Sequence, residues 1–138
     1  MPSTFNLTDY SASYIASTNA VINLLGAATL TVYAGGQPAT ASIAATAGNT
    51  VLANFTMPAT ASMAVGATGI ITIGPIADTT WAAAGTPAWS RMIKPGGTIF
   101  DCSTGTAATT SDITIDVSPV TAGAVAHIVA GPTYTVTQ

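Results

Sequence analysis

The sequence predicts an all-β protein: a single-domain antiparallel β-sandwich or jelly roll of about eight strands, with one short N-terminal helix. Three observations predict this class. Threonine, a β-branched residue that favours strands, occurs 25 times. The helix formers Glu, Lys and Gln are almost missing, and Glu is absent from all 138 residues. Short runs of period-two alternation are separated by Gly and Pro turn signals. A chain of this length is expected to form one domain, residues 1–138.

Residues 1–25 are expected to lie outside the β-structure. Residues 1–8 are small, polar and uncharged, which is typical of an extended arm, with Phe5 and Leu7 as possible anchors. A helix is predicted over residues 9–25, capped by Asp9 or the threonine before it. Its apolar positions recur at spacings of four and seven residues: Tyr10, Tyr14, Val21 and Leu25.

The strands are expected between residues 29 and 137, each bounded by Gly, Pro or other turn residues. The eight predicted strands are 29–33, 51–57, 69–73, 88–94, 98–103, 111–117, 124–129 and 133–137. The clearest is 111–117, where Ile113, Ile115 and Val117 alternate with polar residues and so share one face.

A hairpin is predicted around Pro95-Gly96-Gly97. If these residues form a three-residue loop, the facing pairs are Lys94–Thr98, Ile93–Ile99 and Arg91–Asp101. The last pair would be a cross-strand ion pair worth about 0.2–1 kcal/mol. Trp89 shares that face, so the guanidinium of Arg91 is expected to stack along the indole.

Composition excludes several functions. Charged residues make up 5% of the chain, against about 25% in an average soluble domain. The net charge is −3 with no basic cluster, so no nucleic-acid partner is expected. No run of about 20 apolar residues and no signal peptide pattern occurs, so no membrane partner is expected. Such an uncharged surface suits a protein that is covered by other proteins.

The ionisable residues give no pattern of a catalytic or metal site. The single His127 lies in a strand-like run and is expected to be a hydrogen-bonded structural residue. The single Cys102 rules out an internal disulfide and is expected to be a buried, inert thiol. Asp112 and Asp116 share a strand face about 13 Å apart, too far for a carboxylate pair acting on one bond. No enzyme activity, catalytic residue, metal or cofactor is therefore expected.

The aromatic residues are the best candidates for an interface. Trp89 lies in a predicted strand and is expected in the core. Trp81 lies in a loop or edge, where interface and core are equally open. The candidate interface residues are Phe5, Leu7, Tyr33 and Trp81.

The chain resembles a family of small all-β virion structural proteins of tailed bacteriophages. The resemblance comes from the strand Thr29–Tyr33 with the following Gly35-Gly36-Gln37-Pro38-Ala39 turn, from Val51–Phe55, and from the hairpin segments Pro87–Arg91 and Gly97–Ser103. The tail, Asp112-Ile113-Thr114 and a terminal Thr-rich strand, is also similar. By size and composition the chain is most similar to a capsid cement, or head decoration, protein.

The resemblance implies a function in the virion, on the outer surface of the capsid, after assembly in the host cytoplasm. The implied partners are the major capsid protein and further copies of the chain in a homodimer or homotrimer, which staple neighbouring capsid subunits against the pressure of the packaged genome. The alternative is a tail- or fibre-associated receptor- or carbohydrate-binding module, which needs an exposed aromatic platform beside polar groups. A self-assembling surface-layer subunit also fits the composition.

Overall fold

A computed structural model describes residues 28–40, 43–45, 48–58, 63–65, 70–73, 75–94, 97–106, 111–130 and 133–135. All regular structure in these ranges is β-structure, so the predicted all-β class is confirmed for the described part. The predicted arm (1–8), with Phe5 and Leu7, and the predicted helix (9–25) lie outside the described residues.

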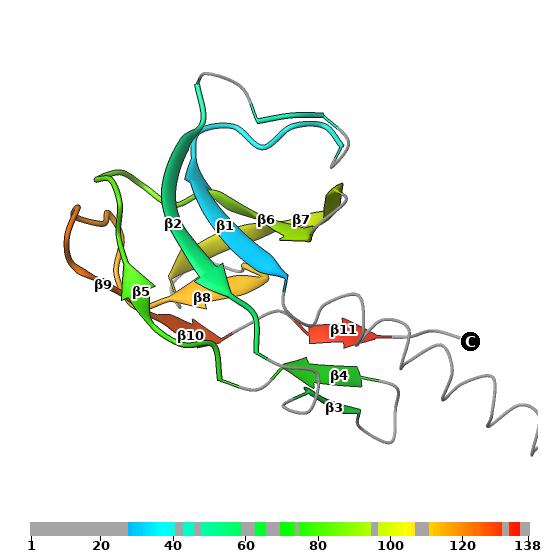
Figure 1. The fold of residues 1–138 in the computed structure, drawn as a ribbon. Helices are drawn as coiled ribbons and strands as arrows, with labels where there is room; N and C mark the ends of the chain where they lie inside the picture. Colours follow the sequence, from blue (N-terminus) through cyan, green and yellow to red (C-terminus); the bar gives the residue numbers. More distant parts are fainter. Residues whose placement is uncertain are drawn as a thin grey trace, which may run out of the picture.

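The described strands form three sheets (Figure 1). A curled six-stranded sheet has the order β10-β8-β7-β6-β1-β2, and its strands are β1 (Thr29–Ala34), β2 (Thr50–Thr56), β6 (Trp89–Lys94), β7 (Gly97–Thr106), β8 (Ile113–Ile115) and β10 (Ile128–Ala130). A three-stranded sheet has the order β11-β4-β3, with β3 (Met63–Val65), β4 (Ile70–Ile73) and β11 (Thr133–Thr135). The third sheet pairs β5 (Thr79–Thr80) with β9 (Val125–Ala126).

Two details of the predicted class are wrong. The six-stranded sheet is mixed, not antiparallel, because β7 and β8 pair in parallel from Thr104↔Ile113 to Thr106↔Ile115. The described part also holds eleven strands in place of about eight. The two unpredicted strands, β3 and β5, are too short to show a period. The predicted strand 124–129 divides at His127 into β9 and β10, which belong to different sheets.

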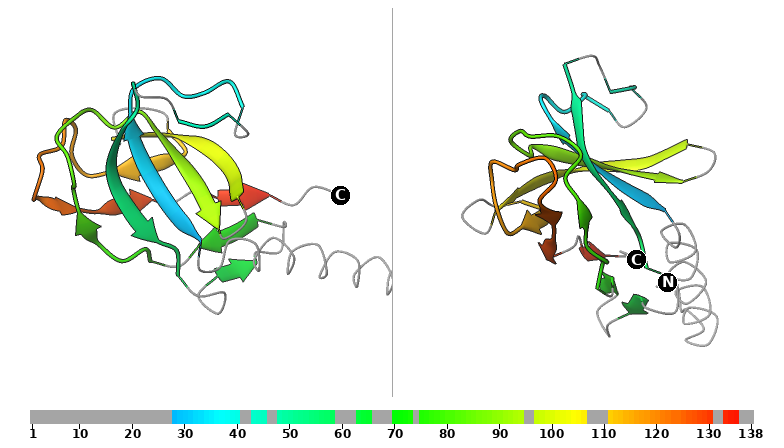
Figure 2. Two further views of the ribbon diagram at one scale, coloured as in Figure 1. Left: turned by 45° about the horizontal axis from the view of Figure 1, so that its top comes forward. Right: turned by 60° about the vertical axis from the view of Figure 1, so that its left-hand side comes forward.

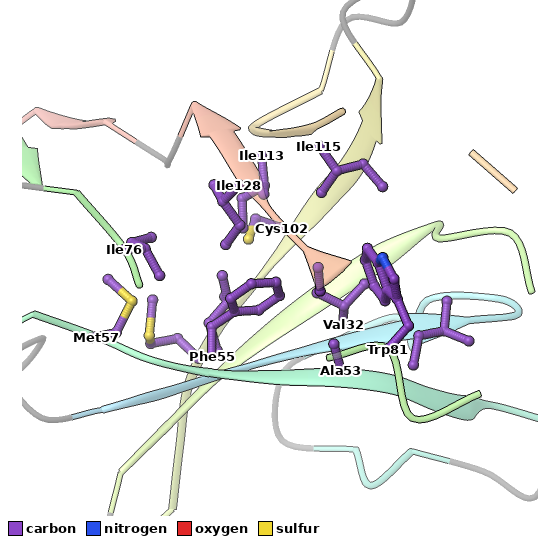
Figure 3. Packing of buried hydrophobic residues seen from close by; sticks show 14 of the residues in the cluster. Val32, Ala53, Phe55, Met57, Ile76, Trp81, Cys102, Ile113, Ile115 and Ile128 are labelled. Atoms are coloured by element: carbon purple, nitrogen blue, oxygen red, sulfur yellow. The ribbon is translucent and has the colours of Figure 1, made fainter. Parts of the chain in front are cut away.

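The inner face of the six-stranded sheet carries the hydrophobic core (Figure 3). Side chains alternate along β1, so Leu30 and Val32 are fully buried on this face. Phe55 lies at the centre of the view and meets Trp81 edge-to-face, with ring centroids 6.3 Å apart. Ile113 and Ile128 complete the cluster from β8 and β10. This face is thus filled by aliphatic and aromatic volume from strands far apart in the sequence.

Residues 78–85 and 120–127, which include β5 and β9, form an antiparallel ribbon (Figure 2). This ribbon adds further residues to the core. Trp81 N–H donates to Ala124 O at 3.0 Å, and Gly85 and Val120 form an isolated bridge. Ala82 N–H donates to Leu52 O at 2.7 Å, which ties the ribbon to β2. Trp81 and Val120 are members of the core cluster, so the ribbon packs on the sheet as one unit.

Candidate interaction surface

The outer face of the six-stranded sheet, opposite the core, carries the predicted ion pair. Arg91 on β6 and Asp101 on β7 are cross-strand partners. Arg91 Nε and Nη2 donate to the two carboxylate oxygens of Asp101 at 2.7 and 2.8 Å. The two side chains are only 5% and 4% exposed. The hydrogen bond to Asp101 raises the pKa of Arg91 above its usual value. The predicted cross-strand pair is therefore present, and it is buried and bidentate.

Two aromatic rings extend this pair into a stack. Tyr33 lies on Trp89 with centroids 4.3 Å apart and an interplanar angle of 12°. The guanidinium carbon of Arg91 lies 5.2 Å from the centre of the Trp89 ring, as the shared face predicted. Trp89 is completely buried, and Tyr33 is 8% exposed. Tyr33 was a candidate interface residue, but its burial in this stack leaves little of the ring for a partner.

The predicted hairpin register is wrong nearer the turn. Met92 pairs with Phe100, but Ile93 pairs with Thr98 and Lys94 with Gly97. The shift makes residue 99 an extra residue on β7, which is a β-bulge. The expected Ile93–Ile99 and Lys94–Thr98 pairs therefore do not form. The register counted back from a turn holds only where neither strand has a bulge, and no residue of this strand predicts the bulge.

The other interface candidate, Trp81, is a core residue. It is 1% exposed and packs against Phe55 on the inner side. The sequence left both core and interface possible for Trp81. In the structure, the ribbon formed by residues 78–85 and 120–127 directs its ring into the core. The indole N–H groups of Trp81 and Trp89 are both buried without a hydrogen-bond partner. Each ring is therefore held by its packing and not by its polar edge.

Cys102 is buried on the inner face, as the sequence predicted. Its thiol lies 3.8 Å from Ser90 O and donates to it. Burial raises the pKa of Cys102 to about 12, with smaller contributions from Asp112 and Asp101. Because the thiolate is the reactive form, this thiol is poorly suited to act as a nucleophile near neutral pH.

His127 lies at the surface, between two carboxylates. Its Nδ1 is 2.6 Å from Oδ1 of Asp78, and both side chains are about half exposed. The pairing Thr79↔Ala126 places Asp78 and His127 at the next position of the ribbon. The pairing Ile115↔Ile128 places Asp116 on the other side of His127. The hydrogen bond to Asp78, its charge, and more weakly the charge of Asp116 raise the pKa of His127.

Three exposed valines lie within two residues of Asp116 or His127 in the sequence. Val125 and Val129 are 63% and 57% exposed, whereas Ala126 and Ile128 between them are buried. Val117 is 46% exposed. It was predicted to share the inward face of Ile113 and Ile115, but β8 ends at Ile115. We call the side chains of Asp78, Asp116, Val117, Val125, His127 and Val129 the valine surface.

Sequence reasoning missed the valine surface, although part of the signal was present. Residues 125–129 alternate between two sets of side chains, Val-His-Val and Ala-Ile. Both sets contain apolar residues, so the alternation predicted a strand but not which set faces solvent. Only the pairing of β5 with β9 and of β8 with β10 fixes the outward set.

The chemistry available to the described residues is limited. They include no group of three or more His, Cys, Asp or Glu side chains placed to hold a metal ion. Asp112 accepts hydrogen bonds from the backbone N–H and the hydroxyl of Ser103 at 2.9 and 2.8 Å, so it ties β7 to the start of β8. Within the described ranges there is also no helix with the length and apolarity needed to cross a membrane.

Comparison with known proteins gives no relative. No family model, no curated protein and no solved structure matches the chain.

Proposed function

We propose that this chain is a structural protein of a tailed-phage virion, a capsid cement protein that binds the outside of the head. In this proposal the β-structure completes a sandwich or jelly roll, and copies of the chain form a homodimer or homotrimer. The partner is the major capsid protein, whose neighbouring subunits the chain staples against the pressure of the packaged genome.

The observation that carries the proposal is a chain poor in charged side chains that exposes several aliphatic ones. Only seven of 138 residues are Asp, Lys or Arg. Two of these seven, Arg91 and Asp101, form a buried ion pair and so add little charge to the surface. Burying uncharged surface against a partner costs little desolvation. The valine surface offers exposed aliphatic side chains for such a contact. A multimer that touches several capsid subunits gains further affinity from effective concentration.

The alternative, a receptor- or carbohydrate-binding module of a tail or fibre, has less support. It was expected to use an exposed Trp81 or Tyr33 as an aromatic platform. Both rings are buried in the described part of the chain, one in the core and one on Trp89. The remaining aromatic candidate, Phe5, lies outside the described residues.

The test is fractionation of virions of the phage that carries this gene, compared with virions grown without the gene. The proposal expects the protein in purified heads at a fixed ratio to the major capsid protein. It also expects heads lacking the protein to rupture at a lower temperature or on milder osmotic shock. Recovery of the protein with tails alone would move the function to the receptor-binding module. Absence from the virion would refute both.

A further inference from the structure

The valine surface has a definite pattern of polarity. Residues 125, 127 and 129 all face solvent. The apolar side chains Val125 and Val129 therefore lie on either side of His127 along the chain. The carboxylates of Asp78 and Asp116 lie on either side of the same imidazole across the strands. The surface therefore has exposed valines before and after His127 along the chain and a carboxylate on each side of it across the strands.

The charge of this surface is negative whatever the state of the imidazole. With neutral His127 the two carboxylates give a charge of −2, and with protonated His127 the charge is −1. Among the described residues, the charged groups that act on His127 are Asp78 and Asp116. A partner that covers the valines must also meet these carboxylates, so charge complementarity requires cations on the partner.

A second copy of this chain has few cations to offer. The sequence contains only Arg91 and Lys94 as lysine or arginine. Arg91 is buried and bonded to Asp101 through Nε and Nη2, so Lys94 alone remains exposed. If the valine surface of one copy met that of another, it would bring four carboxylates together, which is unfavourable.

We propose that the valine surface docks onto an apolar protein surface that carries lysine or arginine side chains and belongs to a different protein. This inference rests on the proposed function, under which that protein is the major capsid protein. Contacts between copies of the chain then use other surfaces, and the valine surface is the side that faces the shell.

The experiment measures binding of the purified full-length chain to heads grown without its gene. The test variant is Val125→Ser with Val129→Ser, which removes the aliphatic groups and keeps the charges. The matched control is Val51→Ser, because Val51 is another exposed valine, 39% accessible, on the edge strand β2. We expect the test variant to bind on the order of tenfold more weakly and the control to bind within about twofold of the wild type.

A second variant tests the charge on the partner. Asp116→Asn removes one carboxylate but keeps the bond between Asp78 and His127. We expect about threefold weaker binding at low salt, with the difference largely lost at about 0.5 M salt. Melting curves of all variants check that they fold, since exposed substitutions of this kind change stability little.

The outcomes separate this inference from the proposed function. If the wild type does not bind the heads, the proposed function fails and the partner named here fails with it. If the wild type binds and the Val125→Ser, Val129→Ser variant binds equally well, the function stands and the inference is refuted. Sedimentation of the free chain gives the last outcome: a test variant that loses its oligomeric state shows a contact between copies, which also refutes the inference.

Discussion

On the inner face of the six-stranded sheet, Leu30, Val32 and Phe55 are buried by aliphatic and aromatic volume, whereas on the outer face Trp89 and Arg91 are buried by a stack that ends in an ion pair. These residues are nearly completely buried on both faces. The two faces are buried by different chemistry, so they should respond to different substitutions. The inner face should depend on volume, and the outer face should depend on whether both charges are kept.

The largest effect is expected from the inner face. Trp81→Ala removes the ring that packs against Phe55 and leaves a cavity between the ribbon and the sheet. We expect a loss of about 3–5 kcal/mol in the free energy of unfolding, measured by urea titration.

The control is Trp81→Phe, which keeps an aromatic ring and removes an indole N–H that is buried without a partner. It should lose clearly less stability than the alanine variant, because removing an unsatisfied donor offsets part of the lost volume. Equal losses in the two variants would show that the ring does not act by filling space.

The outer face gives the next effect. Asp101→Ala leaves the guanidinium of Arg91 buried without its partner, and we expect a loss of about 3 kcal/mol. The double variant Arg91→Met, Asp101→Leu removes both charges and keeps similar volume, so it should lose less than the single variant. Urea titration of both proteins measures the difference.

The order of these two variants tests the comparison directly. A double variant less stable than Asp101→Ala would mean that the outer face depends on volume as the inner face does. The bulge at residue 99 and the turn both lie outside the Arg91–Asp101 pair, so these variants do not test them.

The sequence predicts those parts of the fold that repeat a local rule. The strands β1, β2, β6 and β7 follow from alternation and turn residues, and the facing of Arg91 and Asp101 follows from the hairpin. The inner or outer place of each side chain on β1 then follows from the period of two.

Long-range pairing is what the sequence could not supply. The parallel contact of β7 with β8 and the division of residues 124–129 between two sheets depend on partners distant in the chain. The same dependence explains the site residues. Trp81 turns inward because residues 78–85 pair with 120–127, and Val125, His127 and Val129 turn outward because their neighbours pack on the core.

Cys102 provides a chemical probe of the inner face. Burial raises its pKa to about 12, so the thiolate population at mildly alkaline pH should be far lower than for a free thiol. We expect slow labelling by a maleimide in the native protein and fast labelling after unfolding in urea. Native labelling as fast as that of the unfolded chain would show that the inner face opens readily.

The smallest effect is expected at His127, which belongs to neither buried face. Its pKa is raised in the folded chain, chiefly by the hydrogen bond to Asp78, so protonation favours the folded state. That contribution is fully present below the unfolded histidine pKa of about 6.5 and is lost as the pH rises through the raised value. The difference in Tm between the wild type and His127→Gln should therefore be small and positive at about pH 5.5 and should shrink towards pH 8.5. A difference that grows with pH would contradict the sign of this linkage, and it would mean that Asp78 holds the neutral imidazole more strongly than the charged one.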